Sequence, residues 1–195
     1  LSVGFHAVSR AQVSADETVG VIGCGAIGLG AIIAAHSRSA RVIAMDIDDA
    51  KLEVARQCGA TACVNSATEN LHERLQALSD GHGPHVMIEA VGAPACYRAA
   101  VEEVGAAGRV VYIGWAKQPV EFDTVPFVFK ELDIRGSRNA LPEDFARVVE
   151  AVERGFVPDD VLISRVCPLN EAPEAMVQWN ESPGDVTRIH VTLDG

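Results

Sequence analysis

The sequence predicts a doubly wound α/β fold, in which helices cover both faces of a parallel sheet. Apolar runs of strand length alternate with helical segments over most of the chain, and these runs are continuous and rich in Val and Ile. Continuous runs of this kind are typical of parallel strands that are buried on both faces, whereas a sheet with one wet face alternates apolar and polar residues. The pattern therefore favours strands joined by helical crossovers.

Six apolar runs have the length of strands. In chain order they are Thr18–Gly23, Arg41–Asp46, Thr61–Asn65, His85–Val91, Arg109–Gly114 and Leu132–Gly136. The helical patterns between and after them are Ala26–Ser37, Asp49–Cys58, Glu69–Leu78, Pro94–Val104 and Pro142–Arg154. Gly59 and Gly155 directly follow two of these helices, at the position where a left-handed residue commonly ends a helix.

The pattern changes after Gly155. Residues 156–195 contain four prolines, short apolar runs and a final alternating segment, Thr187–Leu193, that has the pattern of a strand. We therefore predict two units, with residues 1–155 forming the strand–helix domain and residues 156–195 belonging to a second structural unit. The chain opens at Leu1, without Met and within an amphipathic pattern, so we expect it to be a fragment of a longer protein.

Composition excludes several classes of function. The 16 basic and 27 acidic residues give a net charge of −11, which disfavours binding to nucleic acid or to anionic membranes. The longest run without polar side chains, Val19–Ala35, is too short for a membrane span and is broken by five glycines. The five cysteines are scattered without a CxxC pair, so we expect free thiols. Together with the lack of a recognisable leader sequence, these features predict a cytoplasmic protein.

A glycine motif of the form GxGxxG joins the first strand to the first helix. Gly23 allows the tight turn, Gly25 lets the backbone approach a pyrophosphate, and Gly28 permits close packing of helix on strand. Ala26 and Ile27 stand at the first positions of the helix, where unpaired N–H groups and the helix dipole favour phosphate. The motif predicts a Rossmann dinucleotide site, although methyltransferases carry related loops.

An acidic residue at the end of the second strand is the second part of this pattern. Asp46 closes the strand that begins at Arg41, about 20 residues after the glycines, where a carboxylate accepts hydrogen bonds from both ribose hydroxyls. A 2′-phosphate would meet a like charge there, and no Arg follows, so NAD is favoured over NADP. The alternative is that Asp46 merely caps the helix that begins near Asp49.

Several further segments resemble the zinc-type medium-chain alcohol and polyol dehydrogenases. They include the strand–turn–helix–strand unit from Thr18 to Asn65, Glu89–Gly92, Gly108–Gly114, Lys130–Ser137 and Asp185–Val191. The resemblance covers nearly the whole chain and implies that residues 1–155 are the NAD-binding domain and residues 156–195 the return of the chain into a catalytic domain. The segment Gly136–Asp144 is closest to members that act on sugar acids or polyols, such as galactonate, idonate or sorbitol dehydrogenases.

The resemblance also implies cofactor contacts on the adenosine side. Lys51 matches a lysine that helps to hold the adenosine ribose, and Val91 and Gly92 match positions that line the adenosine. Arg188 matches an arginine that reaches the pyrophosphate, a suitable role for a planar fork of donors. The alternative for Lys51 is an ordinary lysine on the exposed face of a helix, and for Arg188 a surface arginine on a terminal strand.

On the nicotinamide side, the resemblance assigns main-chain contacts. Ile113, Ser137 and Asn139 match positions whose backbone groups hold the carboxamide. Trp115 follows the fifth strand, where the family's substrate pocket meets the nicotinamide, so it either shapes specificity or packs in a subunit contact. The family also pairs its sixth strands across a two-fold axis, which implies a homodimer or homotetramer through Leu132–Gly136.

The chemistry of this family requires zinc, whose ligands the resemblance places in a preceding domain. A zinc ion there polarises the alcohol or carbonyl oxygen. His82 and His85 are three residues apart, but they lie in a predicted loop without an acid or thiol partner at ligand spacing, and the remaining histidines are isolated. We therefore assign no catalytic residue and no metal ligand to this chain.

The sequence thus predicts the NAD(H)-binding part of a zinc-dependent oxidoreductase that transfers hydride between NAD and a secondary alcohol of a polyol or sugar acid. One alternative is a zinc-free quinone or enone reductase of the same superfamily, although such enzymes usually favour NADP, which Asp46 disfavours. Another is a stand-alone module that senses NAD(H), against which the tail after Gly155 argues. A methyltransferase remains possible on the glycine motif alone, and it would bind S-adenosylmethionine without NADH.

Overall fold

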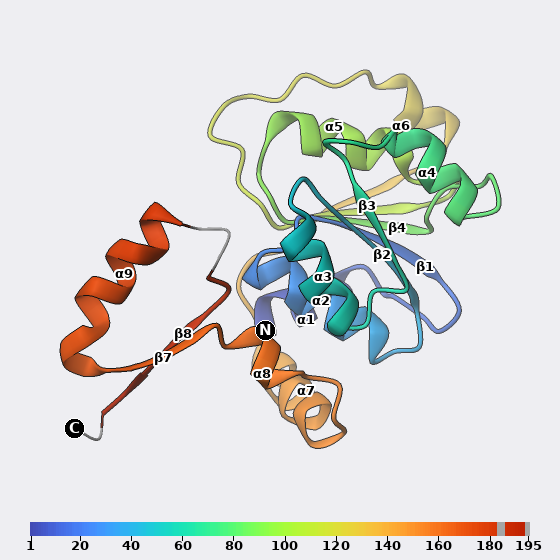
Figure 1. Cartoon of the computed structure of the whole chain (residues 1–195). Coiled ribbons are helices and arrows are strands. Elements are labelled where there is room, and N and C mark those ends of the chain that lie inside the picture. Colours follow the sequence, from blue (N-terminus) through green and yellow to red (C-terminus); the bar gives the residue numbers. More distant parts are fainter. Residues whose placement is uncertain (183–185, 194–195) are drawn as a thin grey trace. The chain divides into compact units, whose positions relative to one another are not determined.

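The computed structural model of the chain describes residues 1–182 and 186–193 (Figure 1). The contacts between residues divide the chain into two compact units, Leu1–Val157 and Pro158–Gly195. Pro183 and Asp185, which belong to the predicted tail segments, lie outside the described residues.

The first unit contains a sheet of six parallel strands in the order β3-β2-β1-β4-β5-β6. The strands are β1 (Thr18–Ile22), β2 (Arg41–Asp46), β3 (Ala62–Asn65), β4 (Val86–Glu89), β5 (Arg109–Tyr112) and β6 (Asp133–Gly136). The helices are α1 (Ser2–Arg10), α2 (Ala26–His36), α3 (Asp49–Gln57), α4 (Leu71–Leu78), α5 (Pro94–Glu103), α6 (Val125–Phe129) and α7 (Pro142–Glu153). This strand order is that of the Rossmann fold, so the predicted fold class is confirmed.

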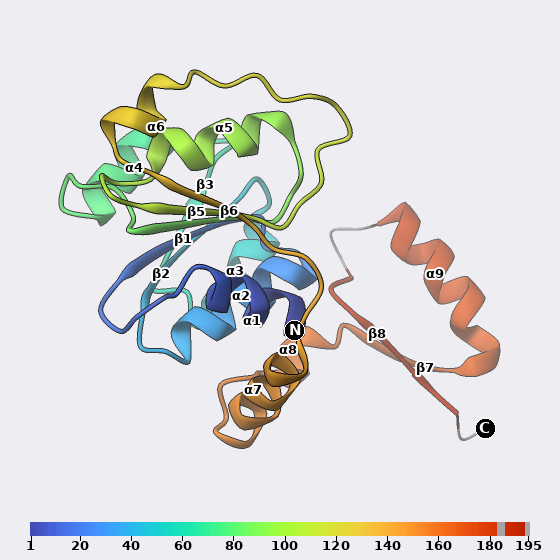
Figure 2. The same ribbon diagram turned by 180° about the vertical axis from the view of Figure 1, so that it is seen from behind.

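The helices form a layer on each face of the sheet. Helices α2 and α3 lie on one face, with α1 packed on α2, and helices α4, α5 and α6 lie on the other (Figures 1 and 2). Every residue of β1 is buried, because this central strand is covered on both sides. That arrangement explains why the strand sequences are continuous apolar runs rather than alternating ones.

Close packing of α1 on α2 depends on small residues. A Cβ atom added at Gly4 would stand 2.3 Å from the backbone nitrogen of Ala31, so only glycine allows this approach. Helix α2 is apolar on nearly all sides, with eight of its residues buried between the sheet and α1. A helix with this composition is typical of the interior of a layered α/β domain.

On the opposite face, a core cluster joins α4 and α5 to the sheet. Leu75 of α4 and Val101 of α5 are buried with Met45 and Met87 from the central strands. Such side chains each remove enough apolar surface from water to stabilise the fold by about 1.5–3 kcal/mol. This packing helps to hold the central strands in register, so that their carboxyl ends lie at one edge of the sheet.

The predicted elements agree with the structure to within a few residues at each end. Gly59 and Gly155 have φ values of +103° and +76°, which confirms the left-handed ends expected of α3 and α7. The strand prediction extended too far at Gly23, Val91 and Gly114, because apolar residues continue into the turns that follow the strands. Two helices of the first unit, α1 and α6, were not predicted as separate elements.

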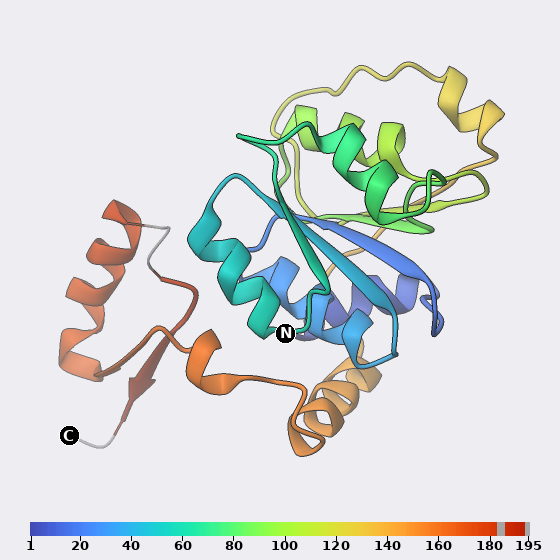
Figure 3. The same cartoon turned by 45° about the vertical axis from the view of Figure 1, so that its right-hand side comes forward.

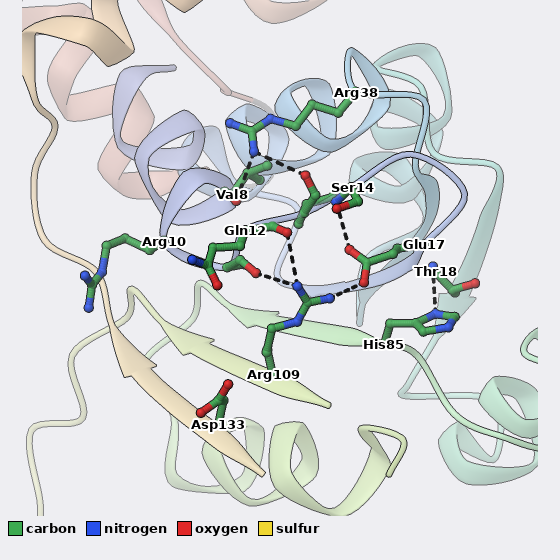
Figure 4. A network of polar contacts seen from close by, with 12 residues as sticks. Val8, Arg10, Gln12, Ser14, Glu17, Thr18, Arg38, His85, Arg109 and Asp133 are labelled. Carbon is green, nitrogen blue, oxygen red and sulfur yellow. Dashed lines mark hydrogen bonds and ion pairs between the residues drawn. The ribbon is translucent and has the colours of Figure 1, made fainter. Parts of the chain in front are cut away.

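The amino edge of the sheet is tied to the segment between α1 and β1 by polar contacts (Figure 4). Arg109 of β5 donates hydrogen bonds to the carbonyl oxygens of Ala11 (3.0 Å) and Gln12 (3.1 Å) and forms an ion pair with Glu17. The backbone N–H of Thr18 donates to Nδ1 of His85 (3.0 Å). These contacts position the start of β1 and so the turn at its other end.

The second unit contains a small parallel sheet of two strands, β7 (Arg165–Pro168) and β8 (Ile189–Thr192) (Figure 3). Between them lies α9 (Ala172–Glu181), preceded by the short 3-10 helix η1 (Leu169–Glu171), and α8 (Asp159–Leu162) opens the unit. The alternating segment Thr187–Leu193 does contain a strand. The expectation that the tail leaves the strand–helix pattern was wrong, because β7, α9 and β8 repeat it once more. No helix among the described residues is long and apolar enough to cross a membrane.

Candidate functional site

The carboxyl ends of the strands bring most of the predicted site residues into one row. Ile22 is in register with Met45 on one side and with Glu89 on the other, and Tyr112 is in register with Gly136. The residues that follow these ends therefore share one edge of the sheet. Parallel strands place ligands at this edge, beside the point where the strand order reverses between β1 and β4.

A cavity of about 430 Å³ lies at this edge, between the ends of β1, β2 and β4. It is lined by Ile22, Gly23, Gly25, Met45, Asp46, Ile47, Lys51, Ser66, Ala90, Val91, Ala93 and Cys96. Five of the residues predicted to bind a cofactor are among them: Gly23, Gly25, Asp46, Lys51 and Val91. The lining combines apolar side chains with one carboxylate and one ammonium group, as in many sites for small organic ligands.

The glycines of the turn differ in what surrounds them. Gly23 has a φ of +95°, and a Cβ atom at Gly28 would lie 1.8 Å from the carbonyl oxygen of Gly23. Both positions therefore require glycine for the fold itself. A Cβ atom at Gly25 would meet no protein atom within 4 Å, so the backbone there faces open space. Gly25 is the N-cap of α2 and provides no side-chain cap for the first turn, which contains Ala26 and Ile27.

The Asp46 carboxylate points at the glycine turn. Its Oδ2 accepts a hydrogen bond from the backbone N–H of Cys24 (2.7 Å), and its Oδ1 accepts from those of Ile47 (2.8 Å) and Asp48 (3.2 Å). The alternative that Asp46 caps the next helix is wrong, because the N-cap of α3 is Asp48, whose side chain accepts from Ala50. Asp46 thus joins the ends of β1 and β2 at the cavity wall.

Cys24 lies beside this carboxylate inside the turn. Burial raises the pKa of its thiol well above the ordinary value, and the negative charge of Asp46 raises it further. The thiol is therefore neutral and acts as a small apolar group. All five cysteines are free, and three of them, Cys24, Cys58 and Cys167, are buried.

Glu89 is a residue of the site for which no role was predicted from the sequence. It is completely buried at the end of β4, where its Oε1 accepts hydrogen bonds from the N–H groups of Val91 (2.8 Å) and Gly92 (2.7 Å). Its other oxygen has no hydrogen-bond partner among the described residues. Burial raises the pKa of this carboxyl, and the two backbone hydrogen bonds oppose that rise. Glu89 fixes the loop that forms the wall of the cavity at Val91.

The residues predicted to contact nicotinamide continue the row along β5 and β6. Ile113 and Ser137 are buried, and their N–H groups donate to the backbone oxygens of Glu89 and Tyr112, both at 2.9 Å. Asn139 has a positive φ of 57°, which turns the chain away after β6. These three residues do not line the cavity that Asp46 lines, so the predicted cofactor contacts extend beyond it along the sheet edge.

Two exposed side chains, Trp115 and Arg138, lie close together in the loops after β5 and β6. Trp115, which follows β5, is 74% exposed, and the Arg138 guanidinium carbon lies 6.0 Å from the centre of its ring. The remaining predicted contact, Arg188, belongs to the second unit, where its backbone oxygen accepts from the N–H of Ser164 (3.0 Å). Its predicted approach to the pyrophosphate stays a prediction.

Comparison with known proteins gives the family. A family model described as zinc-binding dehydrogenase matches residues 26–154. The chain belongs to this family. The match covers the glycine turn from Ala26 onward and continues to the end of α7, and it confirms the predicted resemblance.

Relatives within the zinc-binding dehydrogenase family include enzymes of polyols and sugar acids. The chain is 35% identical over 173 residues to erythritol/L-threitol dehydrogenase from Mycolicibacterium smegmatis, covering 88% of the chain and 48% of that protein. It is 31% identical over 167 residues to L-galactonate-5-dehydrogenase from Escherichia coli, covering 86% of the chain and 49% of that protein. The chain therefore spans about half the length of these curated relatives.

Solved structures show the same fold. The alcohol dehydrogenase from Thermus sp. ATN1 superimposes with a TM-score of 0.89 at 26% sequence identity. The superposition covers 98% of this chain and 56% of that structure. The fold similarity therefore includes both units of the chain.

Proposed function

We propose that this chain is the NAD(H)-binding part of a zinc-dependent oxidoreductase that transfers hydride between NAD and a secondary alcohol of a polyol or sugar acid. The observation that carries the proposal is the Asp46 carboxylate, which lies against the glycine turn in the wall of a cavity of about 430 Å³. The names of the relatives support the substrate class.

The residues of the row would each hold one part of the dinucleotide. Asp46 would accept hydrogen bonds from the ribose hydroxyls, with the Lys51 ammonium group on the same cavity wall. The open space at Gly25 and the uncapped start of α2 would receive the pyrophosphate, where the helix dipole favours negative charge. The main-chain groups of Ile113, Ser137 and Asn139 would orient the nicotinamide ring, which supplies the hydride chemistry when bound.

The carboxylates at and after Asp46 support NAD over NADP. A 2′-phosphate on the ribose would stand beside the Asp46 carboxylate, and the next two residues, Asp48 and Asp49 beyond Ile47, are also acidic. Asp48 caps α3, and Asp49 accepts a hydrogen bond from the Asn65 amide (2.7 Å), so neither is neutralised by a basic side chain in these contacts. Repulsion between a 2′-phosphate and these carboxylates would weaken the binding of NADP relative to NAD.

The zinc part of the proposal rests on the family. Among residues 1–182 and 186–193, no group of three or more His, Cys, Asp or Glu side chains could hold a metal ion. His82 and His85 are exposed, and Nδ1 of His85 accepts from Thr18. The proposal places the zinc ligands in another part of the parent protein, as the resemblance to the family implies.

We also propose that two or four copies of the protein assemble through β6, and that the protein is located in the cytoplasm. Strand β6 is one of the two edge strands of the sheet, and Ile134 on it is 42% exposed. Next to it in the sequence, α6 leaves Val128 and Phe129 77% and 84% exposed. An edge strand beside apolar surface is suited to pairing with the same strand of a second copy.

The test compares two neighbouring carboxylates by calorimetric titration with NADH and NADPH. Asp46→Asn removes the charge in the cavity wall, and we expect it to weaken NADH binding at least tenfold while NADPH binding is unchanged or improved. Asp48→Asn is the matched control, because asparagine still caps α3 and position 48 does not line the cavity. Equal loss in both variants, or no loss in Asp46→Asn, would refute the proposed ribose contact. Binding of S-adenosylmethionine without NADH would favour a methyltransferase.

A further inference from the structure

A second polar cavity, of about 320 Å³, lies beside the carboxyl end of α2 in the first unit. It is lined by Phe5, Ser37, Arg38, Arg147, Glu150, Ala151 and Arg154, which come from α1, from the residues after α2, and from α7 and its end. Three arginines and one glutamate thus line one cavity, on a chain whose net charge is −11. The lining of this cavity is therefore basic, although the chain as a whole is acidic.

Arg38 is held in place by neutral oxygens. Its Nη2 donates to Oγ of Ser9 (2.8 Å). Its Nη1 approaches the carbonyl oxygen of Val8 (Figure 4) and that of Val13, both at 3.4 Å. The group is partly buried and forms no ion pair with any residue in the described part of the chain. Burial lowers the pKa of Arg38, and the neighbouring charge of Arg147 lowers it further. A partly buried cation without a carboxylate is costly unless something offsets its charge.

Arg147 reaches the same hydroxyl from the other side. Its Nη1 donates to Oγ of Ser9 (3.2 Å) and forms an ion pair with Oδ1 of Asp144 (2.9 Å). Two guanidinium groups therefore share one neutral oxygen. The other oxygen of Asp144 is already used, because it is 2.8 Å from Nδ1 of His6 and accepts from the N–H of Leu141 (2.8 Å). Asp144 raises the pKa of Arg38, but it does not contact that guanidinium.

Arg154 completes the basic lining at the end of α7. It pairs with the cavity's own carboxylate, Glu150 (3.1 Å), and its guanidinium carbon lies 4.9 Å from the centre of the Phe156 ring. Both partners of this ion pair are more than half exposed, so the pair contributes little and is free to rearrange. Arg38 is then the arginine of this lining that forms no ion pair among the described residues.

We propose that this cavity binds a phosphate-sized oxyanion between Arg38 and Arg147. The planar fork of a guanidinium group matches the oxygens of phosphate, and an anion placed between two such groups replaces their mutual repulsion with charge-assisted hydrogen bonds. The cavity is separate from the cofactor site, because Arg38 follows the last turn of α2 whereas the glycine turn precedes its first. The 11 residues of α2 place these ends roughly 16 Å apart.

The volume leaves room for more than the anion itself. Free phosphate and the phosphate group of a small ester share the chemistry that Arg38 and Arg147 recognise. Inorganic phosphate and glycerol 2-phosphate, compared at equal ionic strength, distinguish the two sources. Tighter binding of the ester would show that its organic part occupies the rest of the cavity. Equal binding would show that the site recognises the phosphate group alone.

The experiment is an NMR titration of the chain with inorganic phosphate, following the Nε–H signals of Arg38 and Arg147. NADH is present throughout, so that phosphate cannot report from the glycine turn. We expect both signals to shift and to saturate, and Arg147→Met to weaken binding about tenfold or more, since a charge-assisted pair is lost. Arg56→Met is the control, because Arg56 pairs with Glu53 on α3, away from the cavity, and is 53% exposed.

Arg147 is the safer position for the decisive variant, because its side chain is 47% exposed whereas Arg38 packs against the backbone. Arg38→Met is tested as well, with its folding checked from the NMR spectrum. Shifts that fail to saturate, or that sodium chloride reproduces at the same ionic strength, would overturn the proposal. Equal phosphate affinity in Arg147→Met and the wild type would also overturn it, whatever the result of the NADH titrations.

Discussion

The two glycines at the start of α2 predict opposite results for the same substitution. A Cβ atom at Gly28 would lie 1.8 Å from the carbonyl oxygen and 2.9 Å from the carbonyl carbon of Gly23, and both are backbone atoms that cannot rotate away. A Cβ atom at Gly25 meets nothing within 4 Å. Gly28→Ala therefore tests packing of the turn, and Gly25→Ala tests the space left for a ligand.

The magnitudes follow from these contacts. Overpacking costs about 1–3 kcal/mol and more where backbone must move, whereas alanine inside a helix gains at most about 1 kcal/mol over glycine. We expect Gly28→Ala to lower the free energy of unfolding by about 2 kcal/mol or more. Gly25 has φ −75° and ψ −178°, which alanine also adopts, so Gly25→Ala changes stability by about 1 kcal/mol or less as an N-cap effect.

The assay is urea unfolding of both variants followed by circular dichroism, together with calorimetric titration with NADH. Gly25→Ala is expected to fold normally and to bind NADH at least tenfold more weakly, because its methyl group would occupy the space of the pyrophosphate. The reasoning fails if Gly25→Ala binds NADH as the wild type does. It fails equally if Gly28→Ala is as stable as the wild type.

Substitutions at three further positions test the loop, the core and the assembly. Glu89→Ala leaves the N–H groups of Val91 and Gly92 without an acceptor and should cost about 2–4 kcal/mol in urea unfolding, whereas Glu89→Gln keeps the acceptor. Burial raises the pKa of Glu89 in the folded state, so folding favours the protonated carboxyl. The free energy of unfolding of the wild type, relative to that of Glu89→Gln, should therefore fall as the pH rises from 4.5 through the raised pKa. A difference between the two proteins that does not change with pH would contradict this. Leu75→Ala, at a fully buried position, should cost about 2–5 kcal/mol, and a loss below about 1 kcal/mol would contradict the core described. Ile134→Lys should convert a dimer to monomer in light scattering, and a wild type that is monomeric at high concentration would refute pairing through β6.

Short-range patterns predicted most of the fold. Continuous apolar runs marked the six strands, and Gly59 and Gly155 marked helix ends by their need for positive φ. The five-residue α6 is too short to show a helical period. In the tail, β7 was missed because a four-residue strand that contains Pro168 resembles a loop.

Side-chain roles that depend on distant partners could not be read from the sequence. The place of Asp46 beside the glycine turn was predictable, because its spacing from the glycines reflects the strand–helix–strand unit itself. Glu89 was visible only as the end of an apolar run, and its hydrogen bonds to Val91 and Gly92 depend on how the loop folds back. The convergence of Arg38 and Arg147 on Ser9 joins residues far apart in the sequence, and no local pattern marks it.

The central claim is that an adenosine ribose without a 2′-phosphate binds against Asp46 beside the glycine turn. The most direct measurement is calorimetric titration of the unaltered chain with NADH and with NADPH under the same salt conditions. The account predicts saturable binding of NADH and at least tenfold weaker binding of NADPH. Equal affinity for the two cofactors, or no binding of NADH, would contradict it.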